Sequence, residues 1–220
     1  MADKKRKIGM FGGTFDPVHK GHLAVAHGAL DRYCLDEIIF IPAARPPHKR
    51  QPMTGFRHRA AMLEAALAGE AKFSISLIEA ERSAPSYTLD TLVEIRERVG
   101  NHHYHLLIGA DSFVEVHLWY RYRDIFRLAD FVVAARPGID REEVARQVRR
   151  LPGSFRYDSD KEMWTREDDD FHIFYFSAVH MDLSSSEIRG RLLGNREVKD
   201  VLPARVAEYI RTHRLYVKTG

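Results

Sequence analysis

Short apolar runs alternate with amphipathic segments along the first part of the chain. Residues 8–11 form an apolar run that ends at two glycines, and residues 37–41 form a second run that stops at Pro42. Both runs are typical of buried strands. Between them, residues 22–30 are alanine-rich and carry apolar side chains at helical spacing. A strand, a helix and a strand in this order predict a βαβ unit with parallel strands and a right-handed crossover.

The same alternation continues through the rest of the chain. Helices are expected at residues 56–68 and 89–99, the second with Leu89, Leu92, Val93 and Val99 on one apolar face,. Further strands are expected at residues 73–76, 104–108, 131–135 and 172–176. Charge and irregularity between residues 137 and 170 predict an exposed helix and loop. The pattern as a whole predicts an α/β fold, a doubly wound (Rossmann-like) parallel sheet with helices on both faces.

Length and composition narrow the class of protein. A chain of 220 residues, 45% hydrophobic and 30% charged, is typical of one globular domain, here residues 1–220,. No apolar run approaches the roughly 20 residues that cross a bilayer, and no apolar signal core follows the basic start, so a cytoplasmic protein is expected. The single cysteine, Cys34, excludes an internal disulfide framework and a multi-thiolate metal site, and a core or half-buried thiol is expected,.

The segment that leaves the first predicted strand carries the first candidate chemistry. Gly12 and Gly13 let the backbone approach a ligand closely, and the helix that follows offers unpaired N–H groups and the positive end of its dipole,. His19 and His22 lie three residues apart and project to one side once the helix has begun, where protonated imidazoles would oppose phosphate charge,. The alternative is an ordinary strand-to-helix turn with two solvated histidines. A zinc site is not favoured, because thiolate or carboxylate partners at suitable spacing are missing.

A second helix start near the end of the chain also suits an anion. Ser184, Ser185 and Ser186 occupy the cap positions of a predicted helix, and Arg189 follows on its first turns,. Taken alone, this segment could be a serine cap with a solvated arginine. Two such helix starts in one chain favour a polyphosphate ligand.

These two segments resemble the signatures of a nucleotidyltransferase family. Residues 13–22 match G-x-F-x-P-x-H-x-G-H, and residues 184–189 match S-S-[ST]-x-I-R, with Ser186 where threonine is usual. The chain is more narrowly similar to bacterial nicotinate-mononucleotide adenylyltransferases, because further family-like stretches follow in order. These stretches are residues 41–42, 46–49, 84–88, 91–92, 108–112, Trp119 and 136–138. The resemblance covers nearly the whole chain except residues 140–170.

The resemblance implies an activity and a set of site residues. The implied reaction transfers AMP from ATP to nicotinate mononucleotide and gives deamido-NAD and pyrophosphate, in NAD biosynthesis. The implied catalytic residues are His19, His22 and Arg189. The implied ATP-binding residues are Gly12, Gly13, Thr14, Phe15, His19, His22, Gly109, Asp111, Ser185, Ser186 and Arg189. The implied acceptor-binding residues are His48, Lys49, Tyr87, Thr88, Trp119 and Arg136. Mg²⁺ is implied as the cofactor, held mainly by ATP phosphates and waters rather than by protein ligands.

The residue types at two of the implied acceptor-binding segments suit a nicotinate group. A helix start at Tyr87 and Thr88 favours a carboxylate at its N–H groups, and Trp119 offers a plane for a pyridine ring. Trp119 could equally be core, and Thr88 an ordinary cap. Asp111, after a predicted strand, is placed for ribose hydroxyls or as a cap.

Two other functions stay open on the sequence. A pantetheine-phosphate adenylyltransferase would share the histidine motif, although such chains are shorter and residues 84–88 and Trp119 argue against it. A non-catalytic nucleotide- or RNA-binding module could use basic clusters at residues 4–6 and 149–150, but a recognised RNA-binding fingerprint is missing,. The expected partners are therefore ATP and nicotinate mononucleotide, with no nucleic acid and no membrane, and the oligomeric state stays open.

Overall fold

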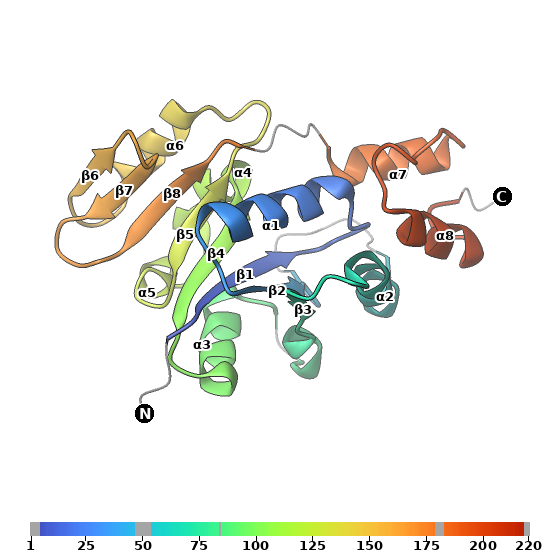
Figure 1. Ribbon diagram of the computed structural model, residues 1–220, viewed down its shortest axis with the longest axis horizontal. Helices are drawn as coiled ribbons and strands as arrows, with labels where there is room; N and C mark the ends of the chain where they lie inside the picture. The colour runs from blue at the N-terminus through green and yellow to red at the C-terminus, as the bar shows by residue number, and fades with distance from the viewer. Residues whose placement is uncertain (1–4, 47–53, 84, 179–182, 218–220) are drawn as a thin grey trace.

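The computed structural model describes residues 5–46, 54–83, 85–178 and 183–217, and the predictions for His48 and Lys49 lie outside these ranges. The described residues form an eight-stranded sheet with the order β3-β2-β1-β4-β5-β8-β7-β6 (Figure 1). The strands are β1 (Lys7–Gly13), β2 (Glu37–Pro42), β3 (Phe73–Ile75), β4 (His103–Gly109), β5 (Asp130–Ala134), β6 (Phe155–Asp158), β7 (Met163–Arg166) and β8 (His172–Phe176). The six strands from β3 to β8 are parallel, which confirms the predicted doubly wound α/β fold.

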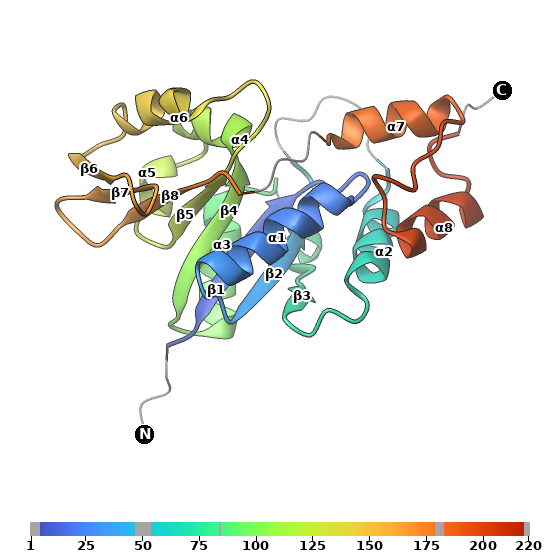
Figure 2. The same ribbon diagram turned by 45° about the horizontal axis from the view of Figure 1, so that its top comes forward.

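Helices cover both faces of this sheet. They are α1 (Lys20–Arg32), α2 (Phe56–Leu67), α3 (Thr88–Val99), α4 (Ala110–Val114), α5 (Tyr122–Ile125), α6 (Arg141–Val148), α7 (Ser185–Leu193) and α8 (Ala204–Thr212), with 3₁₀ turns at Ile78–Glu81 and Val116–Leu118. One core lies between the sheet and α3 to α6, and the other lies between the sheet and α1, α2, α7 and α8. Figure 2 shows α7 and α8 at one end of the molecule and α6 with β6 and β7 at the other. Within the described ranges, none of the helices combines the length and apolar character that crossing a bilayer requires.

The segment between residues 137 and 170 differs from its prediction. It contains a helix, α6, but Val144 is buried there, and β6 and β7 form an antiparallel hairpin on the edge of the sheet instead of a loop. Trp164 of β7 is buried against this sheet's core, whereas its neighbours on the strand are half-buried. Antiparallel edge strands need only one apolar face, so two strands of four residues leave too weak an alternation to detect among so many charges,.

Two smaller predictions are also wrong. Cys34 is exposed, because it lies in the turn that follows α1, with a φ of +51°. On α3, Leu89 and Leu92 are buried as expected, but Val93 and Val99 are 39% and 38% exposed and Ile95 takes the buried position. Leu89, Leu92 and Ile95 follow each other at three-residue spacing, which places them on one side of the helix.

The strand order places a topological switch point between two neighbouring strands of the sheet. Strand order runs in opposite directions on the two sides of the β1 and β4 pair, which makes this pair the topological switch point. In open α/β sheets, ligands bind outside the carboxyl ends of the strands at such a point. The first candidate segment begins with the last two residues of β1, Gly12 and Gly13, and β4 ends at Gly109, two residues before Asp111.

Candidate active site

The turn between β1 and α1 is tightly folded around Phe15. This residue has a φ of +47°, in the left-handed region that non-glycine residues rarely adopt,. Its ring is 1% exposed and lies edge-on to Phe11 and His22, with ring centroids 5.6 and 5.0 Å away. Such a backbone conformation persists only where the surroundings hold it, and here the aromatic packing does so.

The two motif histidines stack on each other, as the helical spacing predicts. Their ring centroids are 3.7 Å apart and their planes are 30° apart. His19 is the N-cap of α1, and its backbone N–H donates to Nδ1 of His22 at 3.2 Å. The neutral His22 ring therefore carries its proton on Nε2, which is its one hydrogen-bond donor. A Cβ on Gly21 would lie 3.0 Å from Nδ1 of His19, so glycine makes room for this ring.

Burial changes the charge expected on these histidines. Desolvation, followed by the charge of Arg136, lowers the pKa of His19 to about 4. Desolvation, followed by the proximity of His19 and Arg136, lowers the pKa of His22 well below its usual value. Both rings are therefore neutral at pH 7 in the free protein, whereas protonated imidazoles were expected beside a bound phosphate.

Arg136 supplies the positive charge beside this pair. Its Nη1 donates to the carbonyl of Leu183 at 3.2 Å, and its Nε lies 3.9 Å from Oδ1 of Asp111. A Cβ on Gly109 would lie 3.0 Å from this Nε, so only glycine fits there without a shift. Arg136, predicted for the acceptor, thus lies among residues predicted for ATP. A small cavity at this point is lined by Phe11, Gly21, His22, Val25, Ile108, Gly109, Ala134, Ala135 and Arg136.

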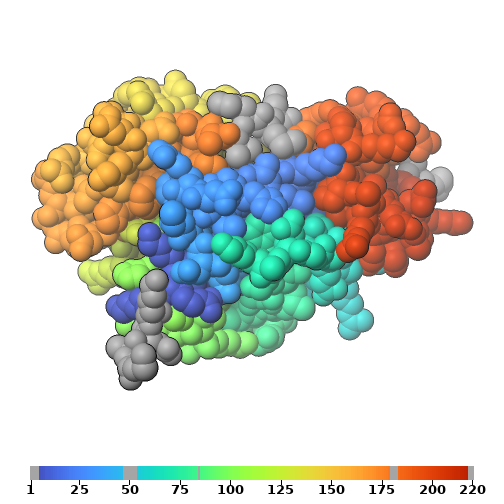
Figure 3. All heavy atoms as spheres, viewed as in Figure 1, coloured from blue at the N-terminus to red at the C-terminus, as the bar shows by residue number. Residues whose placement is uncertain are grey.

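The second motif meets the first one in space. Ser184 caps α7 as predicted, with its Oγ accepting the N–H of Glu187 at 3.1 Å. Ser185 Oγ donates to the carbonyl of Pro17 at 3.0 Å. Arg189 donates from Nη1 to the carbonyl of Asp16 at 2.7 Å and from Nη2 to Ser186 Oγ at 3.1 Å. The starts of α1 and α7 are therefore adjacent, and Figure 3 shows the red C-terminal region against the end of the blue α1 segment.

The predicted acceptor residues lie at the start of α3. Tyr87 is the N-cap and Thr88 the first helical residue. The Tyr87 ring lies 4.6 Å from the ring of Tyr120, with 31° between the planes. Tyr120 is exposed and follows Trp119, which is half-buried against the core. The structure thus connects Tyr87 with the segment of Trp119. The sequence analysis did not name Tyr120, although its position directly after Trp119 could have indicated it.

A buried acidic residue that the sequence reasoning missed fixes this helix start. Glu79 accepts the hydroxyl of Thr91 at 2.8 Å and the N–H of Ala44 at 3.2 Å. Arg82 donates to the same hydroxyl at 2.6 Å. Because Ala44 follows β2, this network ties the loop after β2 to α3. Nothing in the sequence around Glu79 distinguishes it from a surface glutamate.

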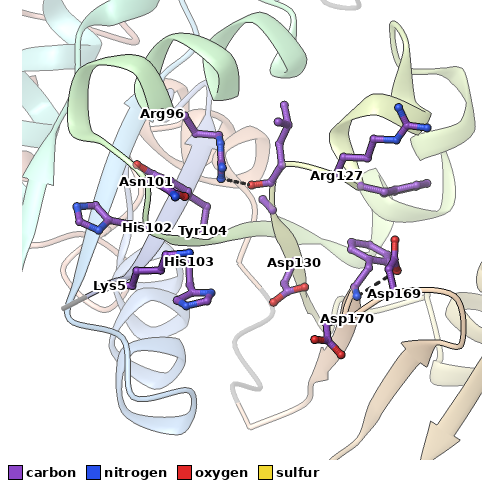
Figure 4. Close-up of a pocket in the computed structure, with 14 residues that line it drawn as sticks. Lys5, Arg96, Asn101, His102, His103, Tyr104, Arg127, Asp130, Asp169 and Asp170 are labelled. Atoms are coloured by element: carbon purple, nitrogen blue, oxygen red, sulfur yellow. Dashed lines mark hydrogen bonds between the residues drawn. The ribbon is translucent and has the colours of Figure 1, made fainter. Parts of the chain in front are cut away.

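A larger cavity of about 400 Å³ lies at the opposite edge of the sheet (Figure 4). Its lining includes His103 and Asp130, which begin β4 and β5, and Lys5, which precedes β1. In Figure 4, Lys5, Arg96, His102 and His103 lie on one side of it, and Arg127 lies with Asp130, Asp169 and Asp170 on the other. This is the amino-terminal edge of the parallel strands, whereas ligands of such sheets bind at the carboxyl edge. The candidate site is therefore the one between α1, α7 and β4.

Comparison with known proteins bears on this geometry. The cytidylyltransferase-like family matches residues 10–191, a span that includes both motifs. The chain belongs to the cytidylyltransferase-like family. Two members, each named "Probable nicotinate-nucleotide adenylyltransferase", come from Trichlorobacter lovleyi and Geobacter sulfurreducens. The first is 37% identical over 96% of this chain and 99% of its own length, and the second is 36% identical over 97% and 100%.

Solved structures share the fold of this chain. The nicotinic acid mononucleotide adenylyltransferase of Plasmodium falciparum, complexed with NaAD, superposes with a TM-score of 0.74. It is 19% identical and covers 96% of this chain and 97% of its own. The same protein complexed with APC gives a TM-score of 0.70 at 20% identity, with the same coverage. At such identities the likeness establishes a shared fold.

Proposed function

We propose that this protein is a nicotinate-nucleotide adenylyltransferase, which transfers AMP from ATP to nicotinate mononucleotide and releases pyrophosphate. The observation that carries the proposal is the meeting of the α1 and α7 starts at the β1 and β4 switch point. Two helix N-termini, two stacked histidines and Arg136 together make a site for a polyphosphate. Full-length relatives with this name, 36 and 37% identical, support the choice of reaction.

The residues of this site can promote the transfer without a protein nucleophile. The acceptor phosphate attacks the α-phosphorus in line, and negative charge develops on the phosphoryl oxygens. His22 holds a donor on Nε2, and Arg136 adds positive charge within reach of the same cavity. Positioning and hydrogen bonding to these oxygens then lower the barrier. Arg189 and the serines of α7 contribute at the triphosphate while also holding the turn before α1.

A divalent ion fits this arrangement as a companion of the nucleotide. Among the residues that the structure describes, there is no group of three His, Cys, Asp or Glu side chains able to hold a metal. Mg²⁺ keeps several waters and binds through substrate phosphates, so it needs no such group. When bound with ATP, it would neutralise phosphate charge, and Asp111, which is exposed and lies 3.9 Å from Nε of Arg136, could hydrogen-bond its waters.

The acceptor is proposed to bind between the start of α3 and the Trp119–Tyr120 segment. Helix N–H groups at Thr88 suit a carboxylate, and the aromatic residues suit a planar pyridine. His48 and Lys49 stay predictions for its phosphate. A pantetheine-phosphate acceptor has neither a carboxylate nor a planar ring, which makes it the poorer fit.

Pyrophosphate release with a panel of acceptors tests the function. The purified protein is incubated with ATP, Mg²⁺ and one of nicotinate mononucleotide, nicotinamide mononucleotide or phosphopantetheine. We expect the fastest release with nicotinate mononucleotide, together with formation of deamido-NAD. Release only with phosphopantetheine would support the alternative enzyme, and binding of ATP with no release in any mixture would support a binding module.

A further inference from the structure

The turn that precedes α1 is held from outside by three segments of the chain, which are residues 54–59, α7 and the C-terminal segment with Tyr216. Each contact uses a backbone carbonyl or the Asp16 carboxylate as its acceptor. The contacts are Arg59 Nη1 with the Thr14 carbonyl at 2.7 Å, Arg189 Nη1 with the Asp16 carbonyl at 2.7 Å, Ser185 Oγ with the Pro17 carbonyl at 3.0 Å, Tyr216 Oη with Asp16 Oδ1 at 2.6 Å and the Thr54 N–H with Asp16 Oδ2 at 3.2 Å. The active-site turn therefore depends on distant parts of the sequence.

The Asp16 carboxylate is the centre of these contacts. It is 3% exposed, and a carboxylate in such a place needs hydrogen bonds to both oxygens,. The Tyr216 hydroxyl satisfies one oxygen from a position 200 residues further along the chain. Burial and the hydrogen bond to Asp16 raise the pKa of Tyr216, so this hydroxyl stays protonated and remains a donor. Arg59 is fully buried, and the charge of the Asp16 carboxylate acts on its guanidinium group.

Movement of Asp16 would reach the reacting groups through the backbone on both sides. Phe15 precedes it and packs against the His22 ring, while Pro17 and Val18 lead to His19, the N-cap of α1. His22 in turn accepts the His19 N–H. A displacement of the turn therefore shifts both histidine rings relative to the bound phosphates. Displacements of this kind are costly, because about 1 Å of misplacement reduces catalysis by roughly 100-fold.

We propose that Tyr216 is a positioning residue for AMP transfer, acting through its hydrogen bond to Asp16. The proposal rests on the proposed function, since it names the residue that fixes the geometry of that site. The Tyr216 hydroxyl donates to Asp16 at 2.6 Å, and it acts on the site through the backbone that Asp16 anchors. The C-terminal segment is thereby part of the enzyme's catalytic architecture.

The first test removes only this hydroxyl. In Tyr216→Phe, we expect kcat for transfer from ATP to fall by about tenfold or more, as for loss of a hydrogen bond to a charged group. KM for the acceptor should change by less than about twofold, since the acceptor site lies at α3. Tyr209→Phe is the matched control: this hydroxyl also lies in the C-terminal region, but it bonds the His58 ring at 3.0 Å. The control should retain the wild-type kcat.

A double-mutant cycle shows whether the effect passes through Asp16. Asp16→Asn alone should also lower kcat, and adding Tyr216→Phe to it should cost little more. Independent, multiplicative losses would overturn the proposal. Equal kcat for wild type and Tyr216→Phe, measured per folded molecule after circular dichroism and thermal unfolding, would also overturn it, because a purely structural tyrosine lowers only the unfolding temperature.

A readout that needs no acceptor separates this proposal from the proposed function. NMR signals of the His19 and His22 rings should shift in Tyr216→Phe and stay in place in Tyr209→Phe. A wild-type protein without transferase activity would overturn the proposed function alone, and the ring signals would still decide the positioning role. Unchanged ring signals in Tyr216→Phe would overturn the positioning role of Tyr216.

Discussion

At the scale of single residues, the candidate site holds two neutral histidines in the free protein. The pKa values of His19 and His22 are lowered mainly by burial, so the free protein holds two uncharged rings beside Arg136. Neutral imidazoles cost less to bury than two cations stacked at 3.7 Å would,. In the proposed site, a bound polyphosphate would accept hydrogen bonds from these rings and would face the charge of the arginine.

Substitution of His22 tests this role. In His22→Ala, we expect kcat to fall by roughly 100- to 1000-fold, because a donor to the developing charge is lost, with a smaller change in KM for ATP. His27→Ala is the control on the same helix, since His27 is exposed and pairs with Glu70 at the surface. Steady-state kinetics of pyrophosphate release measures both variants. Near-normal turnover in folded His22→Ala would contradict the catalytic assignment.

At the scale of elements, the start of α3 is the feature that can select a carboxylate. Tyr87 has φ −86° and ψ 135°, so Thr88 is the first residue with helical geometry. The N–H of such a residue has no acceptor inside its own helix. A nicotinate carboxylate can accept it, whereas a neutral carboxamide gains less from the N–H and the helix dipole. The aromatic residues nearby should bind both pyridines equally.

Proline at position 88 would remove the backbone N–H and leave the helix in place. Proline is tolerated at the first helical position, and the extended backbone of Tyr87 already suits a residue before proline,. We expect Thr88→Pro to keep its fold and to lower the ratio of kcat/KM for nicotinate over nicotinamide mononucleotide by about fivefold or more, as for one lost hydrogen bond to a charge. Thr88→Ala retains the N–H and should keep the ratio. Kinetics with both acceptors at saturating ATP decide it, and an unchanged ratio in Thr88→Pro would contradict this role.

At the scale of the whole molecule, buried histidines link stability to pH. His105 of β4 is buried, and desolvation followed by the charge of Lys7 lowers its pKa to about 4. Its folded pKa lies below its unfolded value, so the unfolded chain binds more protons between the two. Stability is therefore fully present above about pH 6.5 and declines as pH falls toward 4,. Asp130, paired with His105 across β4 and β5, has its pKa raised by burial, which offsets part of the loss at the acidic end.

Replacing His105 should flatten this pH dependence. Between pH 7.5 and 5, His105 alone should reduce the free energy of unfolding by about 2 kcal/mol in the wild type. His105→Gln should show a correspondingly smaller loss over the same range in urea unfolding. His27→Gln, at an exposed histidine of α1 that is not among the groups acting on His105, should leave the wild-type slope. A slope that His105→Gln leaves intact would contradict a lowered pKa at this position.

Hydrophobic periodicity and two motifs predicted much of this protein, because those signals are local. Six parallel strands and α1, α2 and α3 follow from apolar runs and helical spacing. The serine cap of α7 follows from its residue types, and the stacked histidines follow from a three-residue spacing on a helix. The short edge strands β6 and β7 could not be predicted from the sequence, because each buries one face only and lies among charged residues.

The amino-acid sequence by itself determined the doubly wound α/β fold class and the residues of the two motifs. Only the tertiary structure decided how those residues are held and charged. Arg136 joins the histidines because β4 and β5 are neighbours, and Tyr216 reaches Asp16 across 200 residues. The neutral state of His19 is likewise a result of burial, which no local pattern specifies. Contacts between distant segments and desolvation arise only when the whole chain packs, so they cannot be predicted from the spacing of residues in a motif.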